Sequence, residues 1–166
     1  ISLESQVGVG ITFIFTIAFE YDPEKTNEII NNIRVDLRSG QIFKVLVVED
    51  NKINQTITKK IIEKNNCSCF IVDDGFQALD VLNKEVFDVI LMDINMPLIS
   101  GFETTRKIRL KGIQTPIIAL TAFDKDEISK EALDAGMNDI MIKPFESIKL
   151  FQVINNQIKK NKNAVL

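Results

Sequence analysis

The sequence predicts an α/β fold, in which a five-stranded parallel sheet is doubly wound and an N-terminal β-hairpin precedes it. From residue 43 onward, short apolar runs rich in β-branched residues alternate with helix-length amphipathic segments. Strands that alternate with helices form a parallel sheet with both faces covered. The chain has 166 residues, 45% of them hydrophobic, which is enough for one core and a small appendage.

Residues 1–20 are predicted to form the hairpin, because a Gly-Val-Gly turn at 8–10 separates ISLESQ from the β-rich run ITFIFTIAF. A lone apolar hairpin is marginal in water, so we expect it to need a partner surface and to support self-association. Residues 21–42 are polar and predict a linker, with a helical turn near 29–37. The apolar run at 8–19 is shorter than a membrane span and lacks the basic flank of a signal peptide, so no membrane segment is expected in this chain.

The regular part of the chain yields ten elements. Strands are predicted at 44–48, 69–72, 88–92, 116–120 and 139–142, and helices near 52–64, 76–84, 101–110, 125–135 and 146–160. Ile53, Ile57 and Ile61, with Ile62, recur at helical spacing and predict an apolar stripe, and Gly136 is placed to end the fourth helix. Right-handed crossovers favour the flavodoxin-like strand order 2-1-3-4-5. The first and third strands then meet at the switch point, where such folds bind ligands.

Polar side chains stand at the carboxyl ends of four predicted strands. Glu49 and Asp50 follow the first strand, Asp93 the third, Thr121 the fourth and Lys143 the fifth. Three carboxylates at one edge of the sheet repel one another, and a bound cation would offset this repulsion. Hard oxygen ligands at an open position favour Mg²⁺ as that cation. With the ion bound, Asp93 can attack phosphorus, while Thr121 and Lys143 can receive two phosphoryl oxygens.

The same residues also have structural interpretations. Glu49 and Asp50 can cap the next helix, Asp93 can be a turn residue, Thr121 a satisfied hydroxyl and Lys143 a surface charge. Their convergence on one crevice favours the functional interpretation. The acidic pair at 73–74, before a glycine, is predicted to serve only as turn and cap residues.

Composition excludes several other classes of protein. The chain has no histidine, and therefore no Ser-His-Asp triad, histidine base or histidine-ligated metal. A net charge of −3 argues against a dedicated nucleic-acid binder. The spacing of Cys67 and Cys69 fits neither a redox motif nor a zinc site, and predicts apolar thiols in a reducing cytoplasm.

Four sequence runs carry a resemblance to a known family. VLVVEDNKINQ (45–55), DVILMDINMPLISGFE (88–103), PIIALTA (116–122) and MIKPF (141–145) resemble the receiver domain of two-component response regulators. The resemblance covers about 43–160 and implies a receiver domain over residues 43–163. The resemblance implies that Asp93 is the phosphoacceptor and that Glu49 and Asp50 are the acidic Mg²⁺ pair. It also implies that the backbone carbonyl of Asn95 is a further metal ligand.

The resemblance assigns the remaining site residues in the same way. It implies that Thr121 is the switch hydroxyl and that Lys143 contacts the phosphoryl group, with its bond to Pro144 commonly cis. Phe123 resembles a position that governs water access, so slow self-dephosphorylation is expected. Ile140 departs from the family, which often has Tyr or Phe there, so the resemblance does not extend to the coupling of the threonine to an aromatic ring at this position.

Two further runs resemble parts of hybrid sensor kinases. The EDN-x-x-N form at 49–54 is similar to receivers attached to such kinases, and SQVGVGITFIFTIAF (5–19) looks like the closing hairpin of a histidine-kinase ATPase domain. Residues 1–20 would then be a remnant of that domain, in a cytoplasmic part of a protein that is membrane-anchored upstream. Nucleotide-binding boxes are missing, so no ATP binding is expected. The phosphoryl group would come from a histidine kinase or a histidine phosphotransfer protein.

Three alternatives are weighed against this interpretation. A stand-alone response regulator would act by protein–protein binding. A phosphohydrolase of the haloacid-dehalogenase type needs an acid two residues after its nucleophile, and Asn95 offers an amide there. An electron carrier on the same fold would bind a flavin phosphate, which Glu49 and Asp50 would repel.

Overall fold

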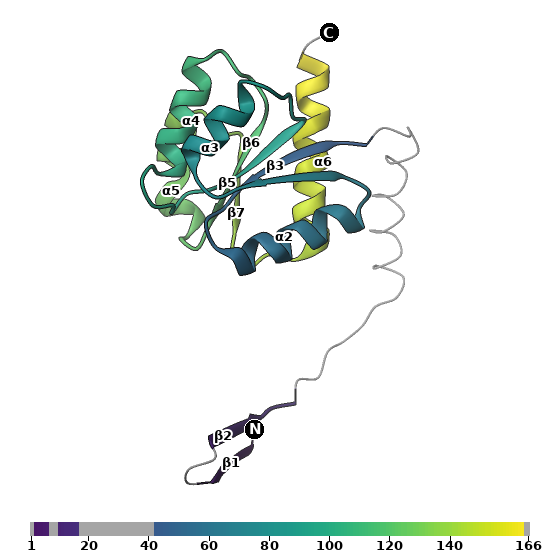
Figure 1. Cartoon of the computed structure of the whole chain (residues 1–166), viewed down its shortest axis with the longest axis vertical. Helices are drawn as coiled ribbons and strands as arrows, with labels where there is room; N and C mark the ends of the chain where they lie inside the picture. Colours follow the sequence, from purple (N-terminus) through teal and green to yellow (C-terminus); the bar gives the residue numbers. More distant parts are fainter. Residues whose placement is uncertain (1, 7–9, 17–41, 165–166) are drawn as a thin grey trace. The chain divides into compact units, whose positions relative to one another are not determined.

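The computed structural model describes residues 2–6, 10–16 and 42–164 (Figure 1). Contacts divide the chain into two units, Ile1–Leu37 and Arg38–Leu166. Residues 17–41, which hold most of the predicted linker and its helical turn at 29–37, lie outside the described residues. No helix in the described segments combines the length and apolar character needed to cross a bilayer.

The first unit contains an antiparallel hairpin. Strand β1 (Ser2–Gln6) pairs with β2 (Gly10–Ile14), with Ser2 opposite Ile14 and Gln6 opposite Gly10. This pairing confirms the predicted hairpin. Three of its apolar side chains are exposed, namely Leu3, Ile14 and Phe15.

The second unit is built on a parallel sheet. Its strands lie in the spatial order β4-β3-β5-β6-β7, which is the predicted order 2-1-3-4-5. Their bounds are β3 (Lys44–Val48), β4 (Ser68–Val72), β5 (Val89–Asp93), β6 (Ile117–Thr121) and β7 (Asp139–Ile142). The doubly wound α/β fold predicted from the sequence is therefore confirmed.

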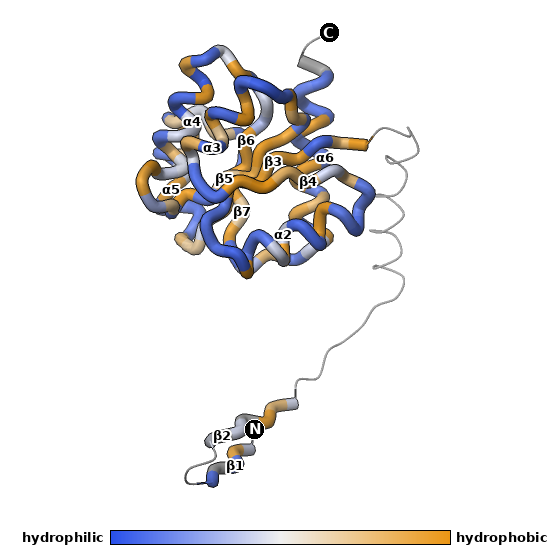
Figure 2. The backbone as a smooth tube through the Cα atoms, in the orientation of Figure 1, coloured by the Kyte–Doolittle hydropathy of each residue, from blue (hydrophilic) through white to orange (hydrophobic). Residues whose placement is uncertain are grey.

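Five helices cover the two faces of this sheet. They are α2 (Lys52–Lys64), α3 (Gly75–Leu82), α4 (Gly101–Leu110), α5 (Lys125–Ala135) and α6 (Ser147–Ala164). Helices α2 and α6 lie on one face, and α3, α4 and α5 on the other (Figure 1). Figure 2 shows that apolar residues concentrate along the central strands. All residues of β5 and β6 are buried, as expected for strands covered on both faces.

Local sequence explains where the helices begin and end. The side chain of Asn51 accepts the N–H groups of Ile53 and Asn54 and caps α2, so neither acidic residue before it serves as the cap. Asp74 caps α3, as predicted. Helix α5 ends at Gly136, whose φ of 93° lies in the left-handed region that glycine adopts without strain.

The apolar stripe predicted for α2 is buried only at its C-terminal end. Ile62 is fully buried, whereas Ile53 is 70% exposed and Ile57 51% exposed. The buried face of the helix also contains Gln55 and Thr58. The first turn of α2 adjoins the polar end of the sheet rather than the apolar core, so a polar residue faces inward there.

Candidate functional site

The predicted acidic residues meet at the carboxyl ends of two neighbouring strands. Val48 of β3 lies opposite Met92 of β5, so the next residues along each strand, Glu49 and Asp93, stand side by side. Carboxylate oxygens of Glu49, Asp50 and Asp93 all lie within 4.8 Å of one another. Glu49 and Asp93 are buried and Asp50 is exposed, which leaves the cluster open to solvent on one side.

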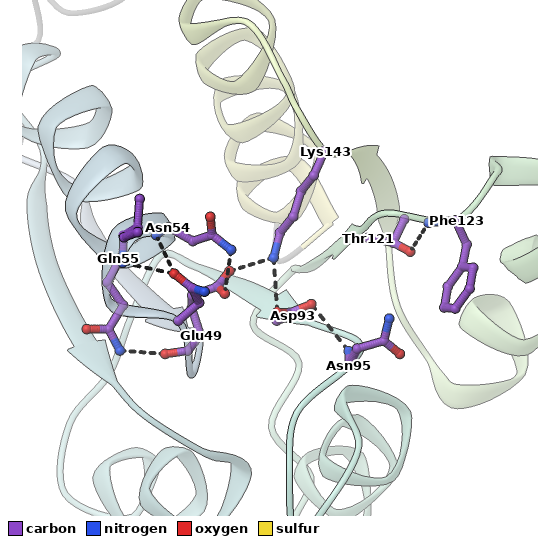
Figure 3. Close-up of polar contacts among 10 residues, drawn as sticks. Glu49, Asn54, Gln55, Asp93, Asn95, Thr121, Phe123 and Lys143 are labelled. Atoms are coloured by element: carbon purple, nitrogen blue, oxygen red, sulfur yellow. Dashed lines mark hydrogen bonds and ion pairs between the residues drawn. The ribbon is translucent and has the colours of Figure 1, made fainter. Parts of the chain in front are cut away.

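Lys143 brings a positive charge to the two buried carboxylates. It directly follows β7, and its Nζ lies 2.6 Å from Oε2 of Glu49 and 3.0 Å from Oδ2 of Asp93 (Figure 3). A cation between two buried carboxylates offsets part of their mutual repulsion. The peptide bond between Lys143 and Pro144 is cis.

The environment of Asp93 favours its neutral form. Burial raises the pKa of this carboxyl above its ordinary value, and the Glu49 carboxylate adds to the effect. Hydrogen bonding and charge from Lys143, and the Asn95 N–H at 3.3 Å from Oδ1, act in the opposite direction. A divalent cation bound here would favour the ionised form, which is the nucleophilic one.

Glu49 is fixed by more partners than the sequence analysis identified. Nδ2 of Asn54 donates to its Oε1 at 2.9 Å. Nε2 of Gln55 donates to the Glu49 carbonyl oxygen at 2.5 Å and to Oδ1 of Asp73 at 2.7 Å. Asp73 is therefore more than a turn residue, and hydrogen bonds from Lys52 and Gln55 lower the pKa of its carboxyl. The EDN-x-x-N form at 49–54 is the sequence signal that could have indicated the contact between Asn54 and Glu49.

Thr121 closes the site on the other side of Asp93. It is the last residue of β6, is fully buried, and its Oγ1 accepts the Phe123 N–H at 3.0 Å (Figure 3). In the described part of the chain the hydroxyl makes no hydrogen bond to Asp93 or Lys143. Its proton is thus free to be donated to a group that enters the site. The Phe123 ring is 47% exposed at the rim.

The arrangement fits a hard divalent cation. Its donors are carboxylate oxygens, one of them exposed, which is the donor type and openness that Mg²⁺ prefers. Asn95 contacts Asp93 through its N–H, so the predicted use of its carbonyl as a ligand remains a prediction. The same site also brings together a carboxylate, a hydroxyl and an ammonium, the groups that phosphoryl transfer uses for attack and charge neutralisation.

Comparison with known proteins agrees with this geometry. The model of the response regulator receiver domain family matches residues 45–155. The autoinducer 2 sensor kinase/phosphatase LuxQ of Vibrio vulnificus is 39% identical over 152 residues, covering 90% of this chain and 18% of its own. Hybrid signal transduction histidine kinase I of Dictyostelium discoideum is 42% identical over 137 residues, covering 76% of this chain and 8% of its own. The chain thus spans less than a fifth of these relatives.

A solved structure that shares the fold contains a metal ion in its own active site cleft. It is the receiver domain of sensor histidine kinase PA1611 from Pseudomonas aeruginosa, described with a magnesium ion coordinated in the active site cleft. The two chains are 36% identical with a TM-score of 0.67, over 72% of this chain and 99% of that one.

Proposed function

The chain belongs to the family of response regulator receiver domains, and we propose that it accepts a phosphoryl group on Asp93 as one step of a phosphorelay. In this step an Oδ atom of Asp93 forms a bond to phosphorus while the bond from phosphorus to a histidine nitrogen breaks, and the imidazole leaves. The observation that carries the proposal is the contact of one ammonium group with two buried carboxylates at the switch point of the sheet.

The other residues have distinct roles in this proposal. Glu49, Asp50 and Asp93, with the carbonyl of Asn95, would hold Mg²⁺, which when bound neutralises charge on the phosphoryl oxygens. Lys143 can turn from the carboxylates toward a phosphoryl oxygen, because phosphorylation removes the free charge of Asp93 and supplies new acceptors. The Thr121 hydroxyl can donate its proton to another such oxygen.

The surroundings of the site support a protein as phosphoryl donor. Ile53 and Ile57 are exposed on α2, whose first turn adjoins Asp50, and Phe123 is exposed at the opposite rim. Exposed apolar side chains around a polar centre are typical of protein interfaces. Since the chain lacks histidine, we assign the donor to a histidine kinase or a histidine phosphotransfer protein.

We further propose that the parent protein is a hybrid histidine kinase. The LuxQ alignment takes in 90% of this chain, which is more than residues 43–166 alone provide, and so extends into the N-terminal region. That extent supports the assignment of residues 1–20 to a kinase ATPase domain, 21–42 to a linker and 43–163 to the receiver. A stand-alone response regulator would use the same Asp93 chemistry. Two free thiols, Cys67 and Cys69, suit a reducing compartment such as the cytoplasm.

Phosphorylation by a small donor tests the core of the proposal. With acetyl phosphate and Mg²⁺, the wild-type chain is expected to gain the mass of one phosphoryl group, in a linkage that hydroxylamine cleaves. Asp93→Asn should gain nothing, while Asp80→Asn, at an exposed position on α3, should behave as the wild type. Equal gain on Asp93→Asn, or none on the wild type, would refute it. Repeated turnover of p-nitrophenyl phosphate would instead indicate a phosphohydrolase.

A further inference from the structure

Asn54 holds one oxygen of the buried Glu49 carboxylate and has no part in the phosphoryl transfer described above. Its Nδ2 donates to Oε1 at 2.9 Å, while Nζ of Lys143 donates to Oε2 at 2.6 Å (Figure 3). Because a carboxylate only accepts hydrogen bonds, the nitrogen of the Asn54 amide must be the atom that faces it. Each oxygen of Glu49 is therefore held by a different part of the fold.

The backbone of Glu49 is fixed independently of Asn54. Its N–H donates to the Val72 carbonyl oxygen at 3.1 Å, and its carbonyl oxygen accepts from Nε2 of Gln55 at 2.5 Å. Gln55 is buried and also bonds to Asp73 on the neighbouring loop. The main chain at Glu49 would keep its place without Asn54, so the Asn54 contact acts on the side chain alone.

The helix does not need the Asn54 side chain. Asn54 is the third residue of α2, and the Asn51 side chain already accepts its backbone N–H at 3.2 Å. Asparagine is a weak helix former within a helix, so local helix propensity does not explain this residue. Its amide group is instead turned toward the acidic cluster.

We propose that Asn54 is a positioning residue for the metal ion, which holds Oε1 of Glu49 so that Oε2 stays directed toward Asp93. The inference rests on the proposed function, since it assumes that the cluster binds Mg²⁺. A glutamate has one more rotatable bond than an aspartate, so its carboxylate has more orientations to lose when an ion binds. A hydrogen bond that fixes the carboxylate beforehand lowers that cost and raises the affinity.

The affinity for Mg²⁺, measured by titration calorimetry on the full chain, tests this role directly. Asn54→Ala and Asn54→Leu both lose the donor, and leucine keeps a strong helix former in α2. We expect each variant to bind Mg²⁺ about three- to tenfold more weakly than the wild type, the size of the net contribution of one typical hydrogen bond. Thr56→Ala is the matched control, because its exposed hydroxyl on the same helix bonds only to the Lys52 carbonyl oxygen.

A double-mutant cycle separates positioning from a general effect on the helix. On a Glu49→Ala background, Asn54→Ala is expected to cause no further loss, because the carboxylate that it orients is gone. An equal loss on both backgrounds would overturn the inference, as would wild-type affinity in both Asn54 variants. If the wild type binds Mg²⁺ and is phosphorylated while the Asn54 variants bind equally well, only this inference fails. If the wild type binds no Mg²⁺, the proposed metal site fails with it.

Discussion

At the scale of single residues, the ammonium group of Lys143 lies between Glu49 and Asp93. It supplies part of the positive charge that a metal ion would bring. That these three residues lie close together could be predicted from the sequence, because the carboxyl ends of parallel strands reach the same edge of the sheet regardless of side-chain conformation. The sequence could not predict how each side chain is held. The contacts from Asn54 and Gln55 depend on which side of the first turns of α2 faces inward, and Ile53 and Ile57 of the predicted stripe are exposed there.

Asp93 makes stability depend on pH in the absence of metal. Burial raises the pKa of its carboxyl in the folded state, so the folded state favours the protonated form. The stability that this residue contributes is fully present below its unfolded pKa of ~3.9, and it is lost as pH rises through the folded-state value.

In EDTA, Asp93→Asn is therefore expected to be more stable than the wild type at neutral pH, because it removes a charge that the fold disfavours. The difference should shrink as pH falls toward ~4. Urea unfolding at both pH values measures it, with the exposed Asp80→Asn as control. A variant that is less stable than the wild type at neutral pH would show that the ion pair with Lys143 outweighs burial.

We predict that Phe123 controls the lifetime of the phosphorylated form. Its ring is partly exposed, and its N–H donates to the hydroxyl oxygen of the buried Thr121. Phe123→Ala keeps that backbone contact and removes the shielding ring, so water should reach the phosphoryl group more easily. The half-life of the Asp93 phosphate after removal of the donor is expected to fall several-fold. Phe76→Ala, at an exposed phenylalanine on α3, should leave the half-life unchanged.

At the scale of elements, the positions of strands and helices were predictable and some of their ends were not. Strand β4 starts at Ser68, which pairs with Lys44, and β5 continues through Asp93, which pairs with Leu120. A search for apolar runs stops before such polar residues, although the hydrogen-bond ladder does not. The end of β5 matters most, because it makes Asp93 part of a rigid strand.

Gly101 allows the start of α4 to pack against the end of β5. A Cβ built at this position would lie 2.2 Å from the Asp93 carbonyl oxygen and 2.9 Å from Cα of Ile94, both of them backbone atoms. Gly101→Ala should therefore destabilise the fold by about 1–3 kcal/mol, although alanine favours helices elsewhere. Chemical denaturation measures the loss. Lys125→Ala, at the exposed first residue of α5, should stay within about 0.5 kcal/mol of the wild type.

The exposed isoleucines of α2 yield a prediction about the donor. If Ile57 contacts a protein that carries phosphohistidine, Ile57→Ser should slow transfer from that protein by about tenfold, the effect of losing one apolar anchor. Phosphorylation by acetyl phosphate should not change, because the site itself is intact. Leu133→Ser, at a more exposed apolar residue on α5, is the control. Slowing with both donors would show that the substitution disturbs the site instead.

At the scale of the whole molecule, the receiver unit holds a complete five-stranded sheet, whereas the described residues of the first unit form a two-stranded hairpin. All five parallel strands and their covering helices lie within residues 44–164. The hairpin has two strands and exposes Leu3, Ile14 and Phe15. Two-stranded hairpins are marginal alone in water, and their free edges pair readily with other strands.

We therefore expect residues 1–20 to cause self-association of the full chain. The fragment 43–166 should be monomeric at concentrations where the full chain forms larger species, as measured by light scattering coupled to size-exclusion chromatography. Phe15→Lys in the full chain should weaken association, because it places a charge on the exposed apolar edge of the hairpin. Both proteins should bind Mg²⁺ equally, since every proposed ligand lies in the receiver unit. A full chain that runs as a monomer would place the hairpin's partner surface on another protein.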